Sequence, residues 1–219
     1  MRIDIHRHAE DQGTADLVMR NLFHYQEDQI SKGGCYSAGL HPWHVNSTSL
    51  QNDLQQVRNM VSRDEVLAIG EAGLDKSIKT PLDVQHDAFL AQVKIAMDFK
   101  KPMIIHCVRA YNEIFSIRKE QKDPQPWIIH WFNASSDMGK QLIDKGFYLS
   151  FGHMLFNEKS KAFKAFTRIP ADYIFLETDD SAYRIDEVYE QAAKLREISV
   201  KNMERIIDDN FTRCFGKKI

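Results

Sequence analysis

The chain has 219 residues, enough for one large hydrophobic core, and its hydrophobic (43%) and charged (27%) fractions are ordinary for a globular protein. Its formal net charge of −2 gives the whole protein no attraction to polyanions, so binding to nucleic acid needs a local basic surface or bound metal. Cys35, Cys107 and Cys214 show no Cys-x-x-Cys spacing, which argues against a disulfide framework or a zinc knuckle and favours a reducing compartment. Because neither a signal peptide nor a membrane-spanning apolar stretch is recognisable, we expect a cytoplasmic protein.

Eight short apolar runs alternate with amphipathic stretches along the chain. Each run is rich in β-branched or aromatic residues, which is typical of buried parallel strands. The predicted strands are 2–6, 21–25, 35–40, 66–70, 103–106, 127–130, 147–151 and 173–176. The predicted helices are 82–99, 110–120, 137–145, 159–167, 187–196 and 200–215, and Gly216 is a plausible C-cap for the last of them.

This alternation predicts an α/β fold, a (β/α)8 TIM barrel, formed by a single domain over residues 1–219. The first βα unit is the exception, because only residues 10–20 separate the first two runs. A barrel that is distorted in this unit, or one with seven strands, is therefore the alternative.

Metal-competent side chains recur at the ends of the predicted strands. The first run ends in His6-Arg7-His8, and strand alternation places both histidines on one face together with Asp4. Four further candidates come at or just beyond the ends of later runs: Glu71, His106, His130 and Asp179. Alone, each has an ordinary structural explanation, such as a hydrogen-bonded histidine or a helix-capping aspartate. Since strand C-termini meet at one rim of a barrel, all six together predict a metal site.

The chemistry of these side chains narrows the reaction class. Nitrogen and carboxylate oxygen donors suit zinc, manganese, iron, nickel or cobalt better than calcium. Six protein ligands are too many for one ion that keeps an open catalytic position, whereas two ions sharing a carboxylate and a water would use them all. Such a pair activates water for hydrolysis of a phosphoester, an amide or an ester, and the ligand set does not choose among them.

The order of several motifs resembles that of the TatD family of metal-dependent deoxyribonucleases, within the amidohydrolase-type barrels. The opening Asp-Ile-His-Arg-His resembles the family's D-x-H-x-H, and Gly-Leu-His-Pro at 39–42 resembles its G-I-H-P. Ile-Gly-Glu-Ala-Gly-Leu-Asp at 69–75 matches I-G-E-x-G-L-D, and Leu-Glu-Thr-Asp at 176–179 matches L-E-T-D. A Q-x3-F-x2-Q-x3-A helix begins at Gln85, His-Trp-Phe begins at His130, and an N-x4-F-G ending begins at Asn210. The PHP-type phosphoesterases also open with H-x-H, but this series fits TatD better.

The resemblance implies a binuclear site with two divalent ions, Mg²⁺, Mn²⁺ or Zn²⁺. His6 and His8 would hold one ion with Asp179 nearby, and His106 and His130 would hold the other. Glu71 would bridge the ions as part of the catalytic set, and Asp179 would be the general base for the attacking water. For substrate binding, Arg109 could clamp a phosphate or carboxylate, while His41 and Trp43 could line the substrate mouth; His41 could equally support a ligand.

The resemblance also implies an activity, a DNA exonuclease acting on single strands or frayed ends. Three departures weaken this expectation: the chain is short, the loop after Asp179 lacks the Arg-Asn-Glu-Pro-type stretch, and Arg109 is one residue further from His106 than in H-x-R. The alternative is a hydrolase of a small phosphoester, amide or ester with the same barrel and metals. A non-catalytic metal-dependent binding module is a third hypothesis, and the sequence suggests neither a membrane nor an obligate protein partner.

Overall fold

The structure is a computed structural model that describes residues 1–9, 14–122 and 125–216. Its strands are β1 (Ile3–Arg7), β2 (Leu17–Phe23), β3 (Tyr36–Gly39), β4 (Val66–Asp75), β5 (Met103–Val108), β6 (Trp127–Ile129), β7 (Phe147–Phe151) and β8 (Ile174–Leu176). They form a sheet with the order β1 to β8, and the registers described are parallel. The predicted α/β fold with the strand order of a (β/α)8 barrel is confirmed.

Helices follow most of the strands. They are α1 (Leu50–Val61), α2 (Leu82–Phe99), α3 (Tyr111–Glu120), α4 (Ser136–Ile143), α5 (Lys161–Phe166), α6 (Ile185–Leu195) and α7 (Val200–Phe215). Short 3-10 helices lie at η1 (Glu27–Gln29), η2 (Pro42–His44), η3 (His153–Phe156) and η4 (Ala171–Tyr173). Over the described ranges, none of the helices combines the length and the apolar character needed to cross a membrane.

The connection between β1 and β2 is the irregular part of the fold, as predicted. Residues 14–16 form no helix, residues 10–13 lie outside the described ranges, and β2 begins at Leu17 instead of residue 21. The predicted C-cap is confirmed, because Gly216 ends α7 in the left-handed conformation with φ +63°.

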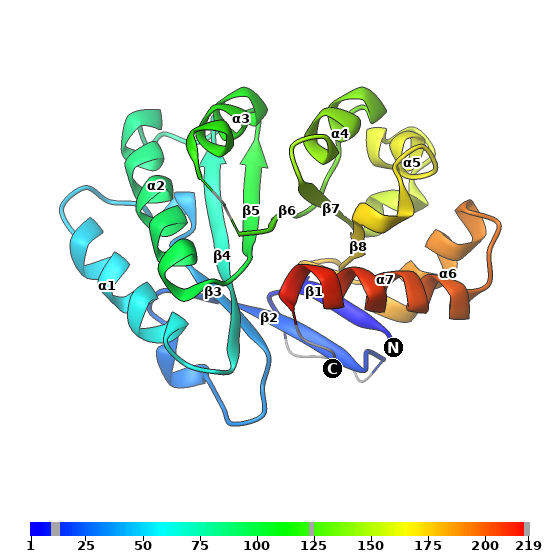
Figure 1. The fold of residues 1–219 in the computed structure, drawn as a ribbon, viewed down its shortest axis with the longest axis horizontal. Coiled ribbons are helices and arrows are strands. Elements are labelled where there is room, and N and C mark those ends of the chain that lie inside the picture. The colour runs from blue at the N-terminus through cyan, green and yellow to red at the C-terminus, as the bar shows by residue number, and fades with distance from the viewer. Residues whose placement is uncertain (10–13, 123–124, 217–219) are drawn as a thin grey trace. The chain divides into compact units, whose positions relative to one another are not determined.

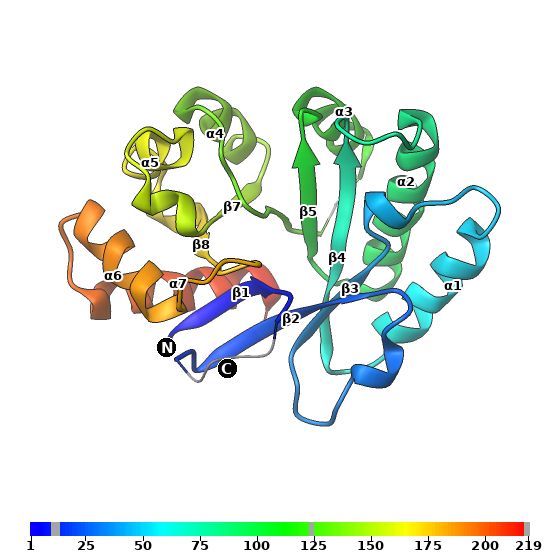
Figure 2. The ribbon, with the colours of Figure 1, turned by 180° about the vertical axis from the view of Figure 1, so that it is seen from behind.

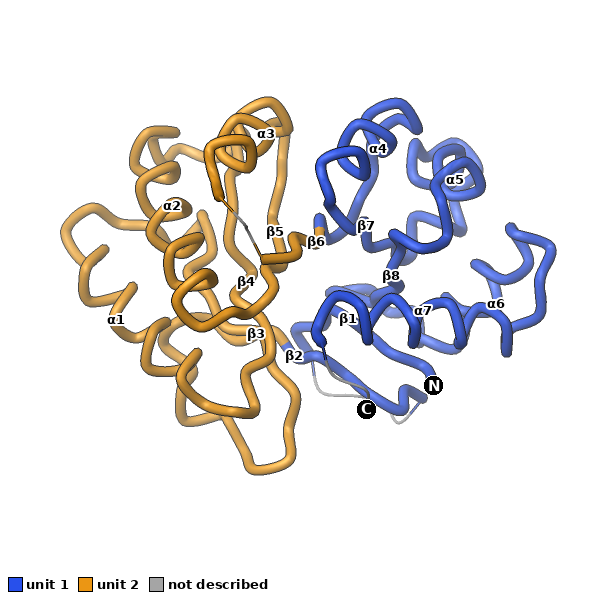
Figure 3. The backbone as a smooth tube through the Cα atoms, viewed as in Figure 1, with its two compact units in different colours: residues 1–20, 129–219 blue, residues 21–128 orange. Residues whose placement is uncertain are grey.

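The chain divides into two compact units, shown in different colours in Figure 3. Unit 1 comprises residues 1–20 and 129–219, and unit 2 comprises residues 21–128.

In unit 2, β4 and β5 lie side by side and point the same way (Figure 2). Gly73 is opposite His106 in this register and has φ +156°. A Cβ atom at Gly73 would lie only 1.9 Å from the carbonyl oxygen of His106. Only glycine permits this approach, which gives the second glycine of the Gly-Glu-Ala-Gly segment a physical reason.

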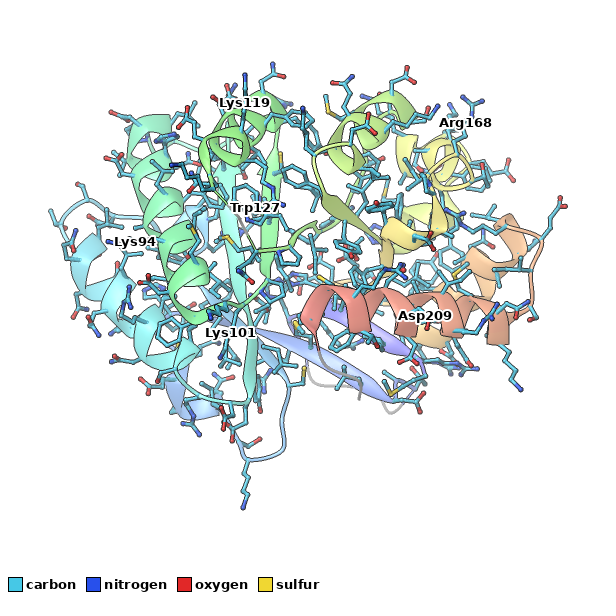
Figure 4. All side chains as sticks on the ribbon, in the orientation of Figure 1. Lys94, Lys101, Lys119, Trp127, Arg168 and Asp209 are labelled. Atoms are coloured by element: carbon cyan, nitrogen blue, oxygen red, sulfur yellow. The ribbon has the colours of Figure 1, made fainter. Side chains whose placement is uncertain are left out.

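In the core of unit 2, an aromatic side chain of α2 packs against one of β6. Trp127, which is labelled in Figure 4, is 1% exposed. Its ring centroid is 5.4 Å from that of Phe89 on α2. The guanidinium of Arg118 lies over the Trp127 ring, 5.1 Å from its centroid. Burial of this large ring together with a cation–π contact fixes β6 against the helices of the unit.

In unit 1, the chain beyond β8 returns to β1. The backbone N–H of Asp179 donates to the carbonyl of His6 at 2.9 Å, and a parallel bridge joins Asp179 to Arg7. Helices α6 and α7 follow this segment in orange and red in Figure 1. The buried Asn210 of α7 donates its amide to the carbonyls of Ala171 and Ile174, at 2.8 and 2.7 Å, which anchors the start of β8.

Candidate metal centre

Unit 1 gathers four of the predicted ligands beside the ends of β1, β6 and β8. The Nε2 atoms of His6 and His8 lie 3.6 and 3.5 Å from Oδ1 of Asp179. The rings of His6 and His130 have centroids 4.5 Å apart. His6, His130 and Asp179 are buried, and each offers one donor atom within 4.8 Å of the other two. We call these four residues cluster 1.

A buried carboxylate supports cluster 1 from β1. Asp4 accepts hydrogen bonds from the backbone N–H and the hydroxyl of Thr178, at 3.0 and 2.5 Å. Arg7 donates to the same hydroxyl at 3.0 Å. Burial raises the pKa of Asp4 to about 7, although the Thr178 hydrogen bonds act in the opposite direction. Asp4 therefore ties the strand that carries His6 to the loop that carries Asp179.

Glu177 is a second buried carboxylate in unit 1, and it holds the segment that follows β6. Its Oε1 accepts from the backbone N–H of Trp131 at 2.5 Å and lies 4.0 Å from Nδ1 of His130. Burial raises the pKa of Glu177 to about 8, and the nearby His130 opposes this shift. This contact lets Glu177 orient the loop that follows β6.

Unit 2 contains a second group of donors, which we call cluster 2: His41, Glu71 and His106. Oε1 of Glu71 lies 2.6 Å from Nδ1 of His106 and 3.2 Å from Nε2 of His41. The two histidine nitrogens are 3.3 Å apart, and all three side chains are buried. One donor atom from each residue lies within 4.8 Å of the other two.

Asp75 links cluster 2 to its surroundings. Its Oδ2 lies 3.2 Å from Nε2 of His106 and accepts from Nε1 of Trp43 at 2.8 Å. Burial alone would raise the pKa of Asp75, but hydrogen bonds from Ser77 and Trp43 outweigh it and lower this pKa to about 2. The side chain of Gln85 accepts from the backbone N–H of Asp75 at 2.8 Å. Asp75 is thus a fixed carboxylate that orients the His106 ring.

Buried amide side chains hold the backbone of cluster 2. Oδ1 of Asn21 accepts from the N–H of Glu71 at 2.6 Å. Gln92 bonds both backbone groups of Leu40, the residue before His41, at 2.8 and 3.0 Å. The glutamines of the predicted Q-x3-F-x2-Q helix therefore position the ends of β3 and β4.

The donor sets of both clusters suit a divalent ion. Each combines imidazole nitrogens with carboxylate oxygen in a buried setting, which is the coordination that zinc, manganese and related ions accept. A further group in unit 1 is formed by His8, Asp179 and the exposed Asp180. The predicted pairing of His106 with His130 and the predicted bridge by Glu71 join residues of both units, and they stay predictions.

Strained backbone marks the same strand ends. Arg109, Trp131 and Asp179 follow β5, β6 and β8 with φ of +56°, +44° and +52°. Left-handed conformations cost non-glycine residues about 1–3 kcal/mol and concentrate at functional sites. Arg109 is exposed and belongs to neither cluster, so its predicted substrate contact stays a prediction.

His41 lies within cluster 2, beside Glu71 and His106, and its predicted role in substrate binding is untested. Two residues of the site had no predicted role. Asp75 stands in the Gly-Leu-Asp signature at the end of β4, and Asp180 follows Asp179 directly, so position beside a motif was the available signal.

Unit 2 also has an open groove of about 650 Å³ away from these donors. It is lined by His24, Tyr25, Glu27, Asp28, Gln56 and Arg63. None of the predicted site residues lines it, and its mixture of acidic and basic groups does not define a ligand.

Parallel strands with buried histidine–carboxylate clusters at their ends define the class of metal-binding α/β proteins. The family described as TatD related DNase matches residues 21–216, and the chain belongs to this family. An Escherichia coli K12 protein named an uncharacterized metal-dependent hydrolase, YcfH, is 27% identical over 91% of this chain and 78% of its own length. A Bacillus subtilis protein of the same description, YabD, is 30% identical over 81% and 75%.

A Cronobacter turicensis protein named 3'-5' ssDNA/RNA exonuclease TatD is 32% identical over 67% of this chain and 57% of its own length. Among solved structures, the Escherichia coli TatD homolog YJJV superimposes with a TM-score of 0.85, at 19% identity over 98% of both chains. An Entamoeba histolytica TatD-family hydrolase gives 0.77 at 14% identity over 97% of both chains. These likenesses confirm the fold.

Proposed function

We propose that the protein is a metal-dependent hydrolase that cleaves phosphodiester bonds of DNA, as an exonuclease on single strands. The observation that carries the proposal is the presence of buried histidine–carboxylate clusters at strand ends in both units. The relatives named metal-dependent hydrolases support the reaction class, and the relative named an exonuclease supports the substrate. We further propose that residues 1–219 act as one hydrolase domain.

The proposed ligands are those predicted from the sequence: His6, His8, Glu71, His106, His130 and Asp179. When bound, two divalent ions would supply Lewis acidity, which lowers the pKa of a water and stabilises charge on phosphate oxygens. The protein's own carboxylates orient the proposed ligands. Asp75 fixes the His106 ring, and Asp4 holds the loop that carries Asp179 against β1. Asp179 is the proposed general base, because its Oδ1 lies 3.6 and 3.5 Å from the Nε2 atoms of His6 and His8 and would therefore adjoin a water bound at these histidines.

Cleavage of labelled single-stranded DNA with Mg²⁺ or Mn²⁺ tests the proposal. We expect shortening products from the wild-type protein, no products with chelator, and at least about a hundredfold loss of kcat in Asp179→Ala, the scale of a lost general base. Asp144→Ala, which removes a carboxylate at the end of α4, is the matched control and should retain wild-type kcat. Absence of cleavage above Asp179→Ala with any of several metals would contradict the proposal.

The second candidate is hydrolysis of a small phosphoester, amide or ester by the same metals. The chain after Asp179 runs through only a few residues before α6 begins at Ile185, and the net charge of −2 offers no general attraction to DNA. A panel of chromogenic esters and phosphoesters separates the two candidates by kcat/KM. A small ester turned over far faster than DNA would favour the second candidate.

A further inference from the structure

The exposed large hydrophobic side chains include two, Trp43 in unit 2 and Trp131 in unit 1, that adjoin a residue of the donor cluster in their own unit. Over the described ranges the exposed side chains of this kind are Tyr25, Trp43, Trp131 and Tyr183, with exposed fractions of 55%, 62%, 44% and 37%. Each comes shortly after a strand: β2, β3, β6 and β8, respectively. The chain has three tryptophans, and the third, Trp127, is buried. A large aromatic ring that stays exposed beside a buried polar cluster has a free π-face for a planar ligand.

In unit 2, Trp43 is exposed but fixed. Its indole N–H donates to Asp75 at 2.8 Å, and its backbone N–H donates to Nδ1 of His41 at 3.1 Å. Its ring centroid is 4.9 Å from that of His41 and 6.2 Å from that of His106. A planar group lying on Trp43 would therefore be next to cluster 2.

Further rings continue from Trp43 along the same surface of unit 2. His44 has its ring centroid 6.1 Å from His41, 4.9 Å from Phe23 and 5.7 Å from Tyr25. Tyr25 in turn borders the open groove, where Arg63 is the basic lining residue. The acidic Glu27 and Asp28 line the same groove and disfavour a phosphate there. Stacking, not charge, is therefore the interaction that this surface offers.

In unit 1, Trp131 follows the proposed ligand His130 directly. Its backbone is held in the left-handed region with φ +44°, and its N–H donates to Glu177. Its ring contacts His153 at a centroid distance of 5.2 Å. The His153 ring is nearly parallel to that of Tyr183, at 5° and 6.4 Å. Unit 1 thus has a second set of aromatic rings, which begins at the residue after His130.

We propose that Trp43 in unit 2 and Trp131 in unit 1 are platforms on which nucleobases of a single-stranded nucleic acid stack. This inference rests on the proposed function and names how that substrate is recognised. Every base has a π-face, so stacking binds single strands without reading their sequence. Stacking adds an attraction to the substrate that does not depend on the net charge of −2, and it implies a shallow dependence of KM on salt.

The test uses single-stranded oligonucleotides in which one position at a time is abasic, with the divalent ion that supports turnover. For the wild-type protein, we expect removal of a stacked base to raise KM roughly five- to hundredfold at one or two positions. Trp43→Ala and Trp131→Ala should each raise KM on the intact oligonucleotide by a similar factor. Each variant should become insensitive to one of the abasic positions, and Trp43→Phe and Trp131→Phe should restore most of the affinity.

The readout is the ratio of KM for abasic and intact oligonucleotides within each variant, because loss of the Trp43–Asp75 hydrogen bond also removes a support of His106. A substrate without a base, methyl p-nitrophenyl phosphate, measures that second effect separately. Equal KM values of wild-type protein for intact and abasic oligonucleotides would overturn the inference while leaving the proposed nuclease function standing. If the protein cleaves no oligonucleotide, quenching of tryptophan fluorescence by intact but not abasic strands still supports stacking, and its absence overturns it. A third outcome is a wild-type dimer that dissociates on Trp43→Ala or Trp131→Ala, with KM values that do not depend on the presence of a base. It would overturn the inference and assign these surfaces to contact with a second copy of the chain.

Discussion

Gln92→Leu tests whether the glutamine of α2 holds the backbone beside cluster 2. Gln92 is 1% exposed, accepts from the N–H of Leu40 at 2.8 Å and donates to its carbonyl at 3.0 Å. Leucine has a similar volume but leaves both backbone groups of Leu40 buried and without these partners. Each unsatisfied group costs about 1–3 kcal/mol, so for two groups we expect the free energy of unfolding to fall by about 2–6 kcal/mol.

Urea denaturation measures this change, because a shift in midpoint at constant m reports stability alone. The matched control is Gln55→Leu on α1, where the glutamine is exposed and its side chain donates to Asn59. This substitution should change stability by less than about 0.5 kcal/mol. Since Leu40 precedes His41, Gln92→Leu should also weaken Mn²⁺ binding about tenfold or more, as loss of supporting contacts does at other metal sites. Equal urea midpoints for Gln92→Leu and Gln55→Leu would refute this reasoning.

The remaining predictions also concern unit 2. Gly73→Ala should destabilise the protein by roughly 3 kcal/mol or more, because a Cβ atom would lie 1.9 Å from the His106 carbonyl oxygen; thermal unfolding checks this, and a wild-type Tm would contradict the close approach. The ion pair of Lys76 with Glu113 lowers the pKa of Glu113 below its ordinary value of 4.5. A lowered carboxyl pKa stabilises the folded state above the unfolded pKa and is lost as pH falls through the folded pKa. Glu113→Gln should therefore cost at most about 1 kcal/mol at pH 7, and this cost should shrink as the pH falls below 4.5, as measured by urea midpoints. A cost that does not change with pH would exclude this pair as its cause.

Much of the fold could be predicted because its signals are local. The helices 82–99 and 200–215 have the predicted bounds, since both carry a continuous apolar stripe with a clear end. Helix α1 was not predicted, because its sequence is mostly polar and only a few side chains, such as Val57 and Met60, are buried. Strand β4 continues to Asp75, beyond the predicted residue 70. Glycines are typical of strand ends, which explains the short prediction, but here they allow the backbone of β4 to approach that of β5.

The candidate site could also be predicted in part, because its main residues lie at strand ends. Strand ends are visible in the sequence, so the residues of clusters 1 and 2 were found by position. Their supports depend on contacts between distant segments: Glu177 bonds Trp131, and Asn21 bonds Glu71. Such pairings follow from tertiary packing, and a single sequence does not show them. The placement of His41 against both Glu71 and His106 is of the same kind.

Calorimetric titration of the metal-free protein with Mn²⁺ shows whether clusters 1 and 2 bind divalent metal. We expect saturable binding that weakens by at least about tenfold in His6→Ala and in His106→Ala, each of which removes one nitrogen donor. His86→Ala is the matched control, because His86 lies on α2 with its side chain 41% exposed and belongs to neither cluster. Its titration should equal that of the wild-type protein. Binding that is unchanged in His6→Ala and His106→Ala, or weakened equally in His86→Ala, would contradict the account.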